Sequence, residues 1–181
     1  MSARHVHDGS VLITLREPLR SDLEAVAAIV GDPRTSRYIP AGTLADLDAC
    51  DRLLRRWIHD WEERRIGYWV IEQRSSREVL GWGGVRFIAA GNVELLNMAY
   101  RVAFDYWGRG IATQAAPRAC TIAKKRHPGV AVIARTAPEN TASERTALRA
   151  GLYHVGRDRW GWNVLADRGV DAAILNDLAP A

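Results

Sequence analysis

The sequence predicts an α+β fold in which a mixed sheet of about seven strands is flanked by about four helices. Three strand-like segments, 67–73, 79–88 and 93–102, are separated by turns of a few residues, which join antiparallel neighbours. A helix at 110–126 and a strand at 130–135 follow, and a strand–helix–strand unit of this length is a crossover between parallel strands. An antiparallel meander that continues into one crossover is therefore expected.

The remaining elements follow from local patterns. A strand is expected at 11–15, and a helix at 21–30 begins with a capping box formed by Ser21 and Glu24. Thr43 is the expected cap of a longer helix that ends near residue 65. Its apolar side chains recur at steps of three and four and predict one buried stripe: Leu47, Cys50, Leu54, Trp57, Ile58 and Trp61.

The C-terminal part is expected to hold one short helix and two strands. The helix spans 141–150 and ends at Gly151, a favourable C-terminal cap. The strands are placed at 153–162 and 170–175.

Composition limits the class of protein. The 181 residues, 48% hydrophobic and 25% charged, suit one folded domain over residues 1–181 and exclude a fibrous or disordered chain. No apolar stretch approaches 18 residues and no secretory signal is visible, so neither a membrane span nor export is expected. Two cysteines, Cys50 and Cys120, cannot form a disulfide framework or a zinc site, which favours the cytoplasm and no metal.

The charge pattern favours a small anionic ligand over a nucleic acid. The net charge is +4, and 23 of the 25 basic residues are arginine. Acidic residues are interspersed almost everywhere, and no run of five like charges occurs. Nucleic acid is therefore an improbable partner.

The most informative segment is the loop that leads into the helix at 110–126. Gly108 and Gly110 allow a ligand to approach the backbone, and the helix N-terminus presents unpaired N–H groups to an anion such as phosphate. A plain tight turn is the alternative. The chain contains no Gly-Lys pair, which excludes the P-loop, and Thr113 stands where a dinucleotide fingerprint needs its third glycine.

A second helix N-terminus lies one crossover further on. Asn140 precedes the helix as a candidate cap, and Thr141 with Glu144 forms a capping box. By itself this segment is ordinary capping. Together, the two N-termini lie at one edge of the sheet and can flank an extended ligand.

These two segments carry a family resemblance. The residues DYWGRGIATQA, then PENTASER and AGLYHVG, resemble the GNAT superfamily of acetyl-CoA-dependent N-acetyltransferases, and most of all its ribosomal-protein N-terminal acetyltransferase branch. The segments 16–18, 37–40 and 67–71 match that branch too, so the resemblance covers about residues 10–165. It implies a sheet that splays at the third meander strand, often beside a β-bulge.

The resemblance also implies a binding site for acetyl-CoA as the co-substrate. The backbone of Tyr100, Arg101 and Val102 would hold the pantetheine arm and the thioester carbonyl. Asn140 would bind the pantetheine, and Ser143 would lie near the sulfur. The pyrophosphate would bind the amides of one continuous run: Gly108, Arg109, Gly110, Ile111, Ala112 and Thr113.

The implied reaction is direct attack of a primary amine on the thioester. Ser143 is the expected proton donor to the departing thiolate, and Tyr153 is its alternative. Asn97 stands where the branch often has a glutamate base, and an amide accepts no proton at neutral pH. Other candidate bases are Glu72, Glu94 and His154.

The acceptor is left open between a peptide N-terminus and a small-molecule amine. The α-amino group, with its pKa of about 7.7–8.0, needs no strong base, which favours a peptide N-terminus over lysine. A catalytically silent CoA-binding sensor or assembly module is the alternative function. Homodimers are frequent in the family, so a homodimer is also compatible with the sequence.

Overall fold

The computed structural model describes residues 11–39, 42–44 and 46–179. In these residues seven strands form one sheet, flanked by five α-helices. The strands are β1 (Ile13–Arg16), β2 (Tyr68–Gln73), β3 (Val79–Ala90), β4 (Val93–Val102), β5 (Val132–Thr136), β6 (Tyr153–Arg157) and β7 (Asn163–Ala166). The helices are α1 (Leu23–Val30), α2 (Leu47–Arg64), α3 (Ile111–Arg126), α4 (Thr141–Arg149) and α5 (Ala172–Asn176).

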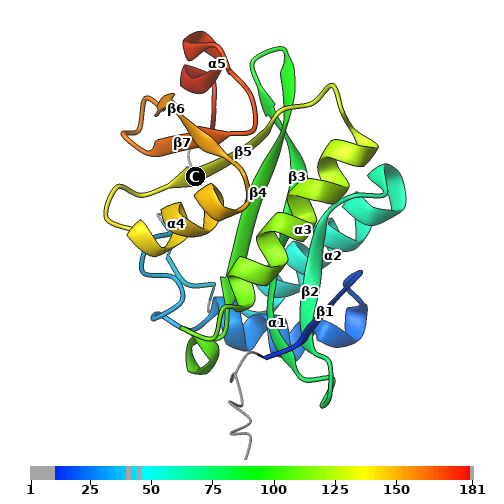
Figure 1. Cartoon of the computed structure of the whole chain (residues 1–181). Coiled ribbons are helices and arrows are strands. Elements are labelled where there is room, and N and C mark those ends of the chain that lie inside the picture. Colours follow the sequence, from blue (N-terminus) through cyan, green and yellow to red (C-terminus); the bar gives the residue numbers. More distant parts are fainter. Residues whose placement is uncertain (1–10, 40–41, 45, 180–181) are drawn as a thin grey trace, which may run out of the picture.

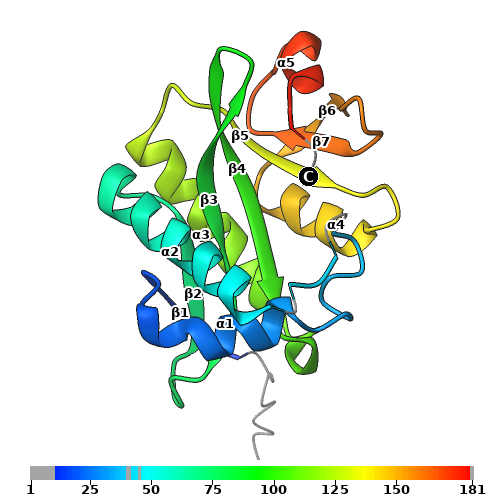
Figure 2. The same cartoon turned by 180° about the vertical axis from the view of Figure 1, so that it is seen from behind.

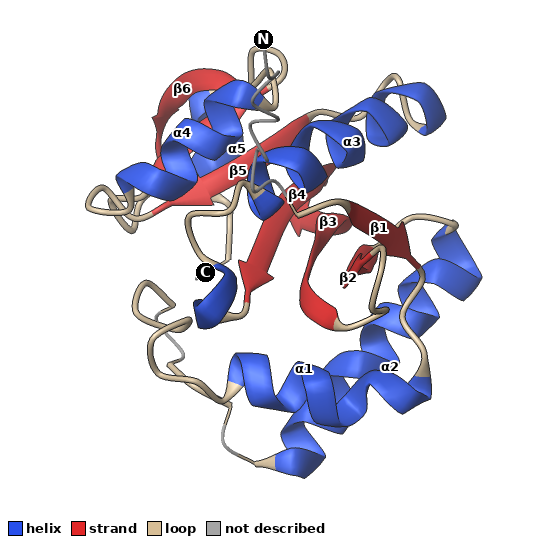
Figure 3. Cartoon of the chain, turned by 60° about the horizontal axis from the view of Figure 1, so that its bottom comes forward, coloured by secondary structure: helices blue, strands red, loops and turns tan. Residues whose placement is uncertain are grey.

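Helices cover both faces of the sheet. The long α3 crosses one face, with α4 beside it (Figure 1), and α1 and α2 cover the other (Figure 2). Figure 3 shows the pair α1 and α2 separated from α3 and α4 by the strands. Because side chains alternate along a strand, neighbouring residues of β4 serve two different cores.

The sheet order is β1-β2-β3-β4-β5-β7-β6, and only the pairing of β4 with β5 is parallel among the described strands. That pairing covers three residue pairs, from Leu96 with Val132 to Met98 with Ala134. Beyond Met98 the two strands diverge, while β4 stays paired with β3 as far as Val102. The expected splayed mixed sheet is therefore confirmed. The register between β3 and β4 is unbroken, so the splay arises without a bulge in β4.

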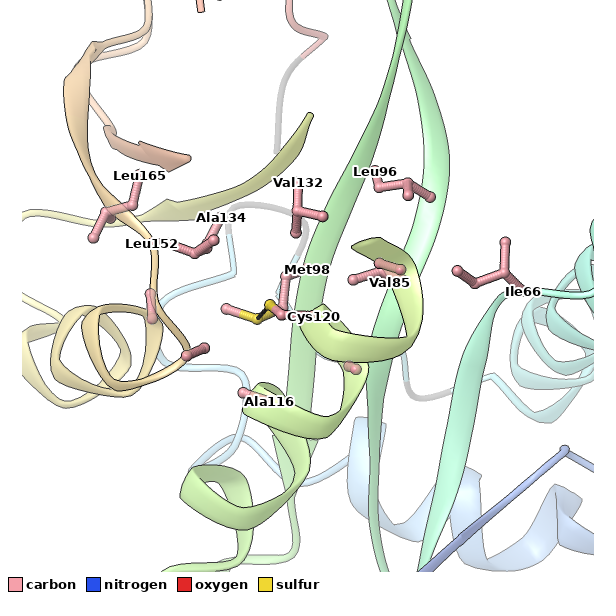
Figure 4. Close-up of a cluster of buried hydrophobic side chains, with 14 of the residues drawn as sticks. Ile66, Val85, Leu96, Met98, Ala116, Cys120, Val132, Ala134, Leu152 and Leu165 are labelled. Carbon is pink, nitrogen blue, oxygen red and sulfur yellow. Dashed lines mark hydrogen bonds between the residues drawn. The ribbon is translucent and has the colours of Figure 1, made fainter. Parts of the chain in front are cut away.

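The core behind the splay joins both arms of the sheet to α3. Leu96 and Met98 of β4 pack with Val132 and Ala134 of β5, and Figure 4 shows them around Cys120. The helix contributes small side chains, which allow it to approach the sheet closely: Ala116, Ala119, Cys120 and Ala123. This packing fixes the point at which β4 and β5 part.

The opposite core is aromatic. Trp57 of α2 is fully buried against Trp82 of β3, with ring centroids 4.7 Å apart, and Tyr68 of β2 lies edge-on to it at 5.7 Å. Most of the predicted α2 stripe is buried, but Leu47 is 53% exposed because it lies in the first turn of the helix.

Two helix starts differ from the prediction. In place of a Ser21–Glu24 capping box, the Asp22 carboxylate accepts from the Leu19 amide and binds Arg16, so a 3₁₀ turn (Arg20–Asp22) precedes α1. The cap of α2 is Asp46, whose carboxylate accepts from the Asp48 amide at 3.0 Å, and not Thr43. In both cases an aspartate carboxylate, and not the predicted hydroxyl, accepts from a backbone amide near the start of the helix.

The C-terminal prediction was wrong in two places. The expected strand 153–162 ends at Arg157 as β6, because Gly161 adopts φ +84° and the Asp158 carboxylate accepts from the amides of Trp160 and Trp162, which closes a turn. The strand β7, which begins after this turn at Asn163, was not predicted. The expected strand 170–175 is instead the helix α5, capped by Asp171, whose carboxylate accepts from the Ala173 amide at 2.8 Å. A capping aspartate before Ala-Ala outweighs the apolar run.

We predict that Leu96→Ala lowers the free energy of unfolding by about 2–5 kcal/mol, because Leu96 is completely buried at the origin of the splay. Urea denaturation followed by circular dichroism measures this loss. Leu148→Ala is the matched control, since Leu148 is 43% exposed and its truncation should change stability by no more than about 0.5 kcal/mol. Equal losses in both variants would contradict this account of the core.

Candidate active site

The splay leaves one edge of β4 unpaired. The Leu96 amide donates to Ala131 O at 2.9 Å, toward β5, and the Ala103 amide donates to Leu80 O at 2.8 Å, toward β3. Backbone groups alternate in direction along a strand, so even-numbered residues of β4 point to the β5 side. Tyr100 and Val102 therefore present backbone groups to the open gap. An extended ligand that carries amides can pair there as another strand would.

The same alternation corrects the expectation for Arg101. Its backbone groups point toward β3, where its carbonyl oxygen lies close to Gly81. The side chain of Arg101, and not its backbone, is the part that reaches the gap. Of the three residues, only Tyr100 and Val102 present backbone groups to the gap.

The loop before α3 offers a group of free amides. Gly108 and Gly110 have φ of +77° and +72°, a left-handed conformation that glycine adopts without strain. The first backbone bond of the helix is donated by Gln114 to Gly110 O, at 3.0 Å. In the described part of the chain, no hydrogen-bond acceptor lies within reach of the amides of residues 108–113. These amides, at the positive end of a helix dipole, are suited to bind an anion.

Side chains hold this loop in place. The Trp107 indole N–H donates to Val102 O at 2.8 Å, which ties the loop to the end of β4. Tyr106 donates its hydroxyl proton to the Glu78 carboxylate at 2.6 Å. The Arg109 guanidinium lies 5.1 Å from the centre of the Tyr106 ring and does not line the cavity described below. Arg109 is therefore the member of the run 108–113 that does not line the cavity.

Across the gap, the N-terminus of α4 faces β4. Asn140 caps the helix, since its side-chain oxygen accepts from the Ser143 amide at 3.1 Å. The Tyr100 hydroxyl lies 3.0 Å from Ser143 Oγ and 3.2 Å from Ser143 O. Burial raises the pKa of Tyr100 above its ordinary value, so this hydroxyl stays protonated and donates. The family resemblance implied a backbone role for Tyr100 only, and the contact of its side chain with Ser143 depends on the fold.

A cavity of about 640 Å³ joins these parts. It runs from the loop before α3, along the end of β4, to the N-terminus of α4 and to residues 35–39 after α1. Most of the predicted ligand-binding residues line it: Tyr100, Arg101, Val102, Gly108, Gly110, Ile111, Ala112, Thr113, Asn140 and Ser143.

Positive charge dominates the cavity wall. The only acidic residue that the described lining contains is Glu139, and it is exposed. Five arginines oppose it: Arg37, Arg101, Arg135, Arg145 and Arg149. The sequence analysis did not single out the last three. Arg145 and Arg149 stand four residues apart on α4, a spacing that places both on one helix face and was visible in the sequence. The charge suits a ligand with several phosphates.

Two predicted catalytic residues lie outside the cavity lining. Asn97 is on the α1–α2 face of β4, where its side-chain amide donates to the Tyr68 hydroxyl at 3.3 Å. Tyr153 is 48% exposed on the edge strand β6. The structure therefore brings together Tyr100, Ser143 and the loop amides, without Asn97 or Tyr153.

The other candidate bases also form their interactions outside the cavity. Glu72 is buried in an ion pair with Arg16, which joins β1 to β2. Glu94 pairs with Arg64 at 2.9 Å, and His154 contacts Glu144 at 2.8 Å. None of the three lines the cavity.

The described residues contain neither a metal cluster nor a membrane-spanning helix. No three of their His, Cys, Asp and Glu side chains are grouped to hold a metal ion. None of their helices is long and apolar enough to cross a membrane.

Comparison with known proteins agrees with this geometry. A family model described as the acetyltransferase (GNAT) domain matches residues 13–153. A protein of Bacillus subtilis (strain 168), the uncharacterized N-acetyltransferase YoaA, is 21% identical over 144 residues, which cover 80% of this chain and 81% of that protein.

Solved structures share the fold. RimL, a ribosomal L7/L12 α-N-protein acetyltransferase in complex with coenzyme A, superimposes with a TM-score of 0.72 at 17% identity, over 90% of this chain and 97% of RimL. Spermidine N-acetyltransferase from Vibrio cholerae, in complex with CoA and spermine, gives 0.68 at 18% identity, over 85% and 92% of the two chains. Since the family model spans more than half of the sequence and the fold agrees with it, the chain belongs to the GNAT acetyltransferase family.

Proposed function

We propose that this protein transfers an acetyl group from acetyl-CoA to a primary amine. The observation that carries the proposal is the run of free amides at residues 108–113, which opens into the same cavity as the unpaired edge of β4. A diphosphate and an arm containing two amides are the two halves of coenzyme A, and the cavity offers one matching surface to each.

Each half of the co-substrate has a suitable partner. The loop amides receive the diphosphate, and the cavity arginines add charge that the phosphates neutralise. The pantetheine arm pairs with backbone groups of Tyr100 and Val102. The Val102 carbonyl is already occupied by the Trp107 indole, so the free groups are the Val102 amide and both backbone groups of Tyr100.

The chemistry follows from this placement. The amine nitrogen attacks the thioester carbon, a C–N bond forms, and the carbon–sulfur bond breaks as the thiolate departs. A backbone N–H in the gap stabilises the oxyanion, a contribution of about 3 kcal/mol per donor. The thiolate takes a proton from Ser143, whose hydroxyl lies 3.0 Å from the Tyr100 hydroxyl; Tyr100 replaces that proton and regains its own from solvent, which receives the proton of the amine. The attacking amine loses its own proton to solvent.

The described lining of the cavity holds no strong base near Tyr100, because Asn97 and the other candidates face elsewhere. An amine that is partly deprotonated at neutral pH needs none, which favours an α-amino group, with its pKa of about 7.7–8.0. The missing base is also the observation that favours a second function, a CoA-binding module without turnover. Thiol release from acetyl-CoA with a panel of amines separates the two.

Location and assembly complete the proposal. We place the protein in the cytoplasm as a single catalytic domain, where its two cysteines, both buried, remain free thiols. The cavity is lined by described residues of one chain, so a homodimer, if formed, would not be needed to complete it.

We predict that Gly110→Ala weakens CoA binding more than tenfold in isothermal titration calorimetry. Alanine disfavours φ +72°, so the loop changes shape and its amides lose their common direction. Gly151→Ala is the matched control, because Gly151 has φ +84° and equally open surroundings but lies outside the cavity. Equal effects of both variants on CoA affinity would contradict the assignment of the loop.

We predict that Ser143→Ala and Tyr100→Phe each lower kcat by about 10²-fold, at the lower end of general acid catalysis, while CoA affinity changes less than threefold. Because the pKa of Tyr100 is raised, its hydroxyl stays protonated and donates across pH 7–9, so no loss of rate in this range should trace to Tyr100. Steady-state kinetics of both variants between pH 7 and pH 9 measure the loss of kcat and its pH dependence. Tyr153→Phe tests the competing donor, and a larger loss there than in Tyr100→Phe would contradict our assignment.

A further inference from the structure

Arg101 is a half-buried cation without a counter-ion. Four arginines in the described chain are half-buried, and three of them pair with carboxylates: Arg16 with Asp22, Arg86 with Asp60, and Arg135 with Asp158. No described carboxylate lies within 4 Å of Arg101. A cation taken partly out of water is costly unless a partner compensates it.

The contacts of Arg101 leave part of its guanidinium unused. Its Nη1 donates to Ser36 Oγ at 3.2 Å and to Val30 O at 3.4 Å. The guanidinium also lies 5.7 Å from the centre of the Trp82 ring. No described acceptor lies within hydrogen-bond distance of Nε or Nη2. These two nitrogens form the edge that binds a carboxylate through two parallel hydrogen bonds.

Arg101 is placed for the acceptor side of the reaction. It follows Tyr100 on β4, but its side chain lies on the opposite face of the sheet, toward α1 and the loop after it. It lines the cavity there together with Arg37 and Tyr38. The loop amides and Ser143 lie on the α3–α4 side. An amine that approaches from the α1 side therefore passes Arg101 on its way to the gap at Tyr100.

The charge on this side selects among amines. Arg37 and Arg101 are both cationic, and the acidic Glu139 of the described lining stands before α4, at the other side of the gap. A polyamine would bring further positive charge toward two arginines. An amine with a neighbouring carboxylate would instead supply the counter-ion that Arg101 lacks.

We propose that the acceptor is an amine that carries a carboxylate, and that Arg101 binds this carboxylate through Nε and Nη2. The inference rests on the proposed acetyl transfer and narrows its substrate class. Arg101 is a specificity-determining residue in this scheme, and its partners Val30 and Ser36 hold the guanidinium in place. The carboxylate belongs either to a free amino acid or to an acidic side chain next to a peptide N-terminus.

The test compares each acid with its own amide. Amino acids and their amides form one arm, and the dipeptide amides Ala-Glu-NH₂ and Ala-Gln-NH₂ form the second. Thiol release from acetyl-CoA gives kcat/KM, normalised to the fraction of free amine at each pH. We expect at least a tenfold preference for the acid in one arm, which identifies the source of the carboxylate. In Arg101→Gln the preference should fall below threefold, with the KM for acetyl-CoA unchanged.

A purely structural role for Arg101 is separable from this one. If it only caps the C-terminal end of α1, Arg101→Gln lowers the melting temperature and leaves the ratio of acid to amide unchanged, which overturns the inference. Arg101→Lys keeps the charge but not the paired donors, so it should fold and retain only part of the preference. This second variant keeps the test decisive if Arg101→Gln does not fold.

The remaining outcomes distinguish the two proposals. Acetylation of spermidine or neutral amines, with no preference for acids, overturns the inference and leaves acetyl transfer intact. CoA binding measured by calorimetry with no turnover of any amine overturns both. A protein that binds no CoA refutes the proposed function at its first step, before the acceptor is involved.

Discussion

The site depends on the unpaired edge of β4. Backbone N–H and C=O groups form strong hydrogen bonds, and almost all of those buried in a protein are paired. Here the ladder between β4 and β5 stops after three pairs, while β4 continues for four more residues. The packing of Leu96, Met98 and Val132 on the small side chains of α3 sets where the strands part. The free edge that results requires a partner with the same hydrogen-bonding pattern, and an amide-containing arm has it.

Side chains alternate along β4, so neighbouring residues of this strand lie on opposite faces of the sheet. Tyr100 directs its side chain to Ser143, on the face of α3 and α4, while Arg101 directs its side chain to the end of α1. The backbone of Tyr100 faces the gap between them. Two of the three roles that we propose, holding the arm and donating a proton, fall to Tyr100, and the third, selecting the acceptor, falls to Arg101. Two neighbouring residues can hold all three roles because a β-strand directs their side chains to opposite faces.

Local patterns predicted the elements that local forces determine. The meander, the crossover and the glycine loop before α3 were visible because turn length, hydrophobic period and glycine spacing act over a few residues. The elements in the last third of the chain were harder to predict from local patterns. The expected strand at 170–175 was wrong because Asp171 caps a helix, and its five residues are too short to show a period of 3.6. The caps predicted at Ser21 and Thr43 were wrong because the Asp22 carboxylate accepts from the Leu19 amide and Asp46 caps α2.

The free amides of the candidate site were predictable from the sequence, whereas its side-chain contacts and the backbone direction of Arg101 were not. Free amides follow from a helix N-terminus wherever one occurs, so the loop from Gly108 needed no tertiary information. The meeting of Tyr100 with Ser143 joins residues 43 positions apart and depends on the angle of the splay, which no local pattern contains.

The environment of Arg101 was likewise not predictable from the sequence. A sequence shows that an arginine is present, but only the fold shows that every other half-buried arginine in the described chain has a carboxylate and this one does not. A charge left without a partner beside a reaction site destabilises the empty protein, and a substrate of opposite charge recovers that energy on binding. In the scheme that we propose, backbone groups of the shared fold bind the co-substrate, whereas isolated side chains such as Arg101 select the amine. For that reason we look for the acceptor in the charges of the α1 side, and not in the loop before α3.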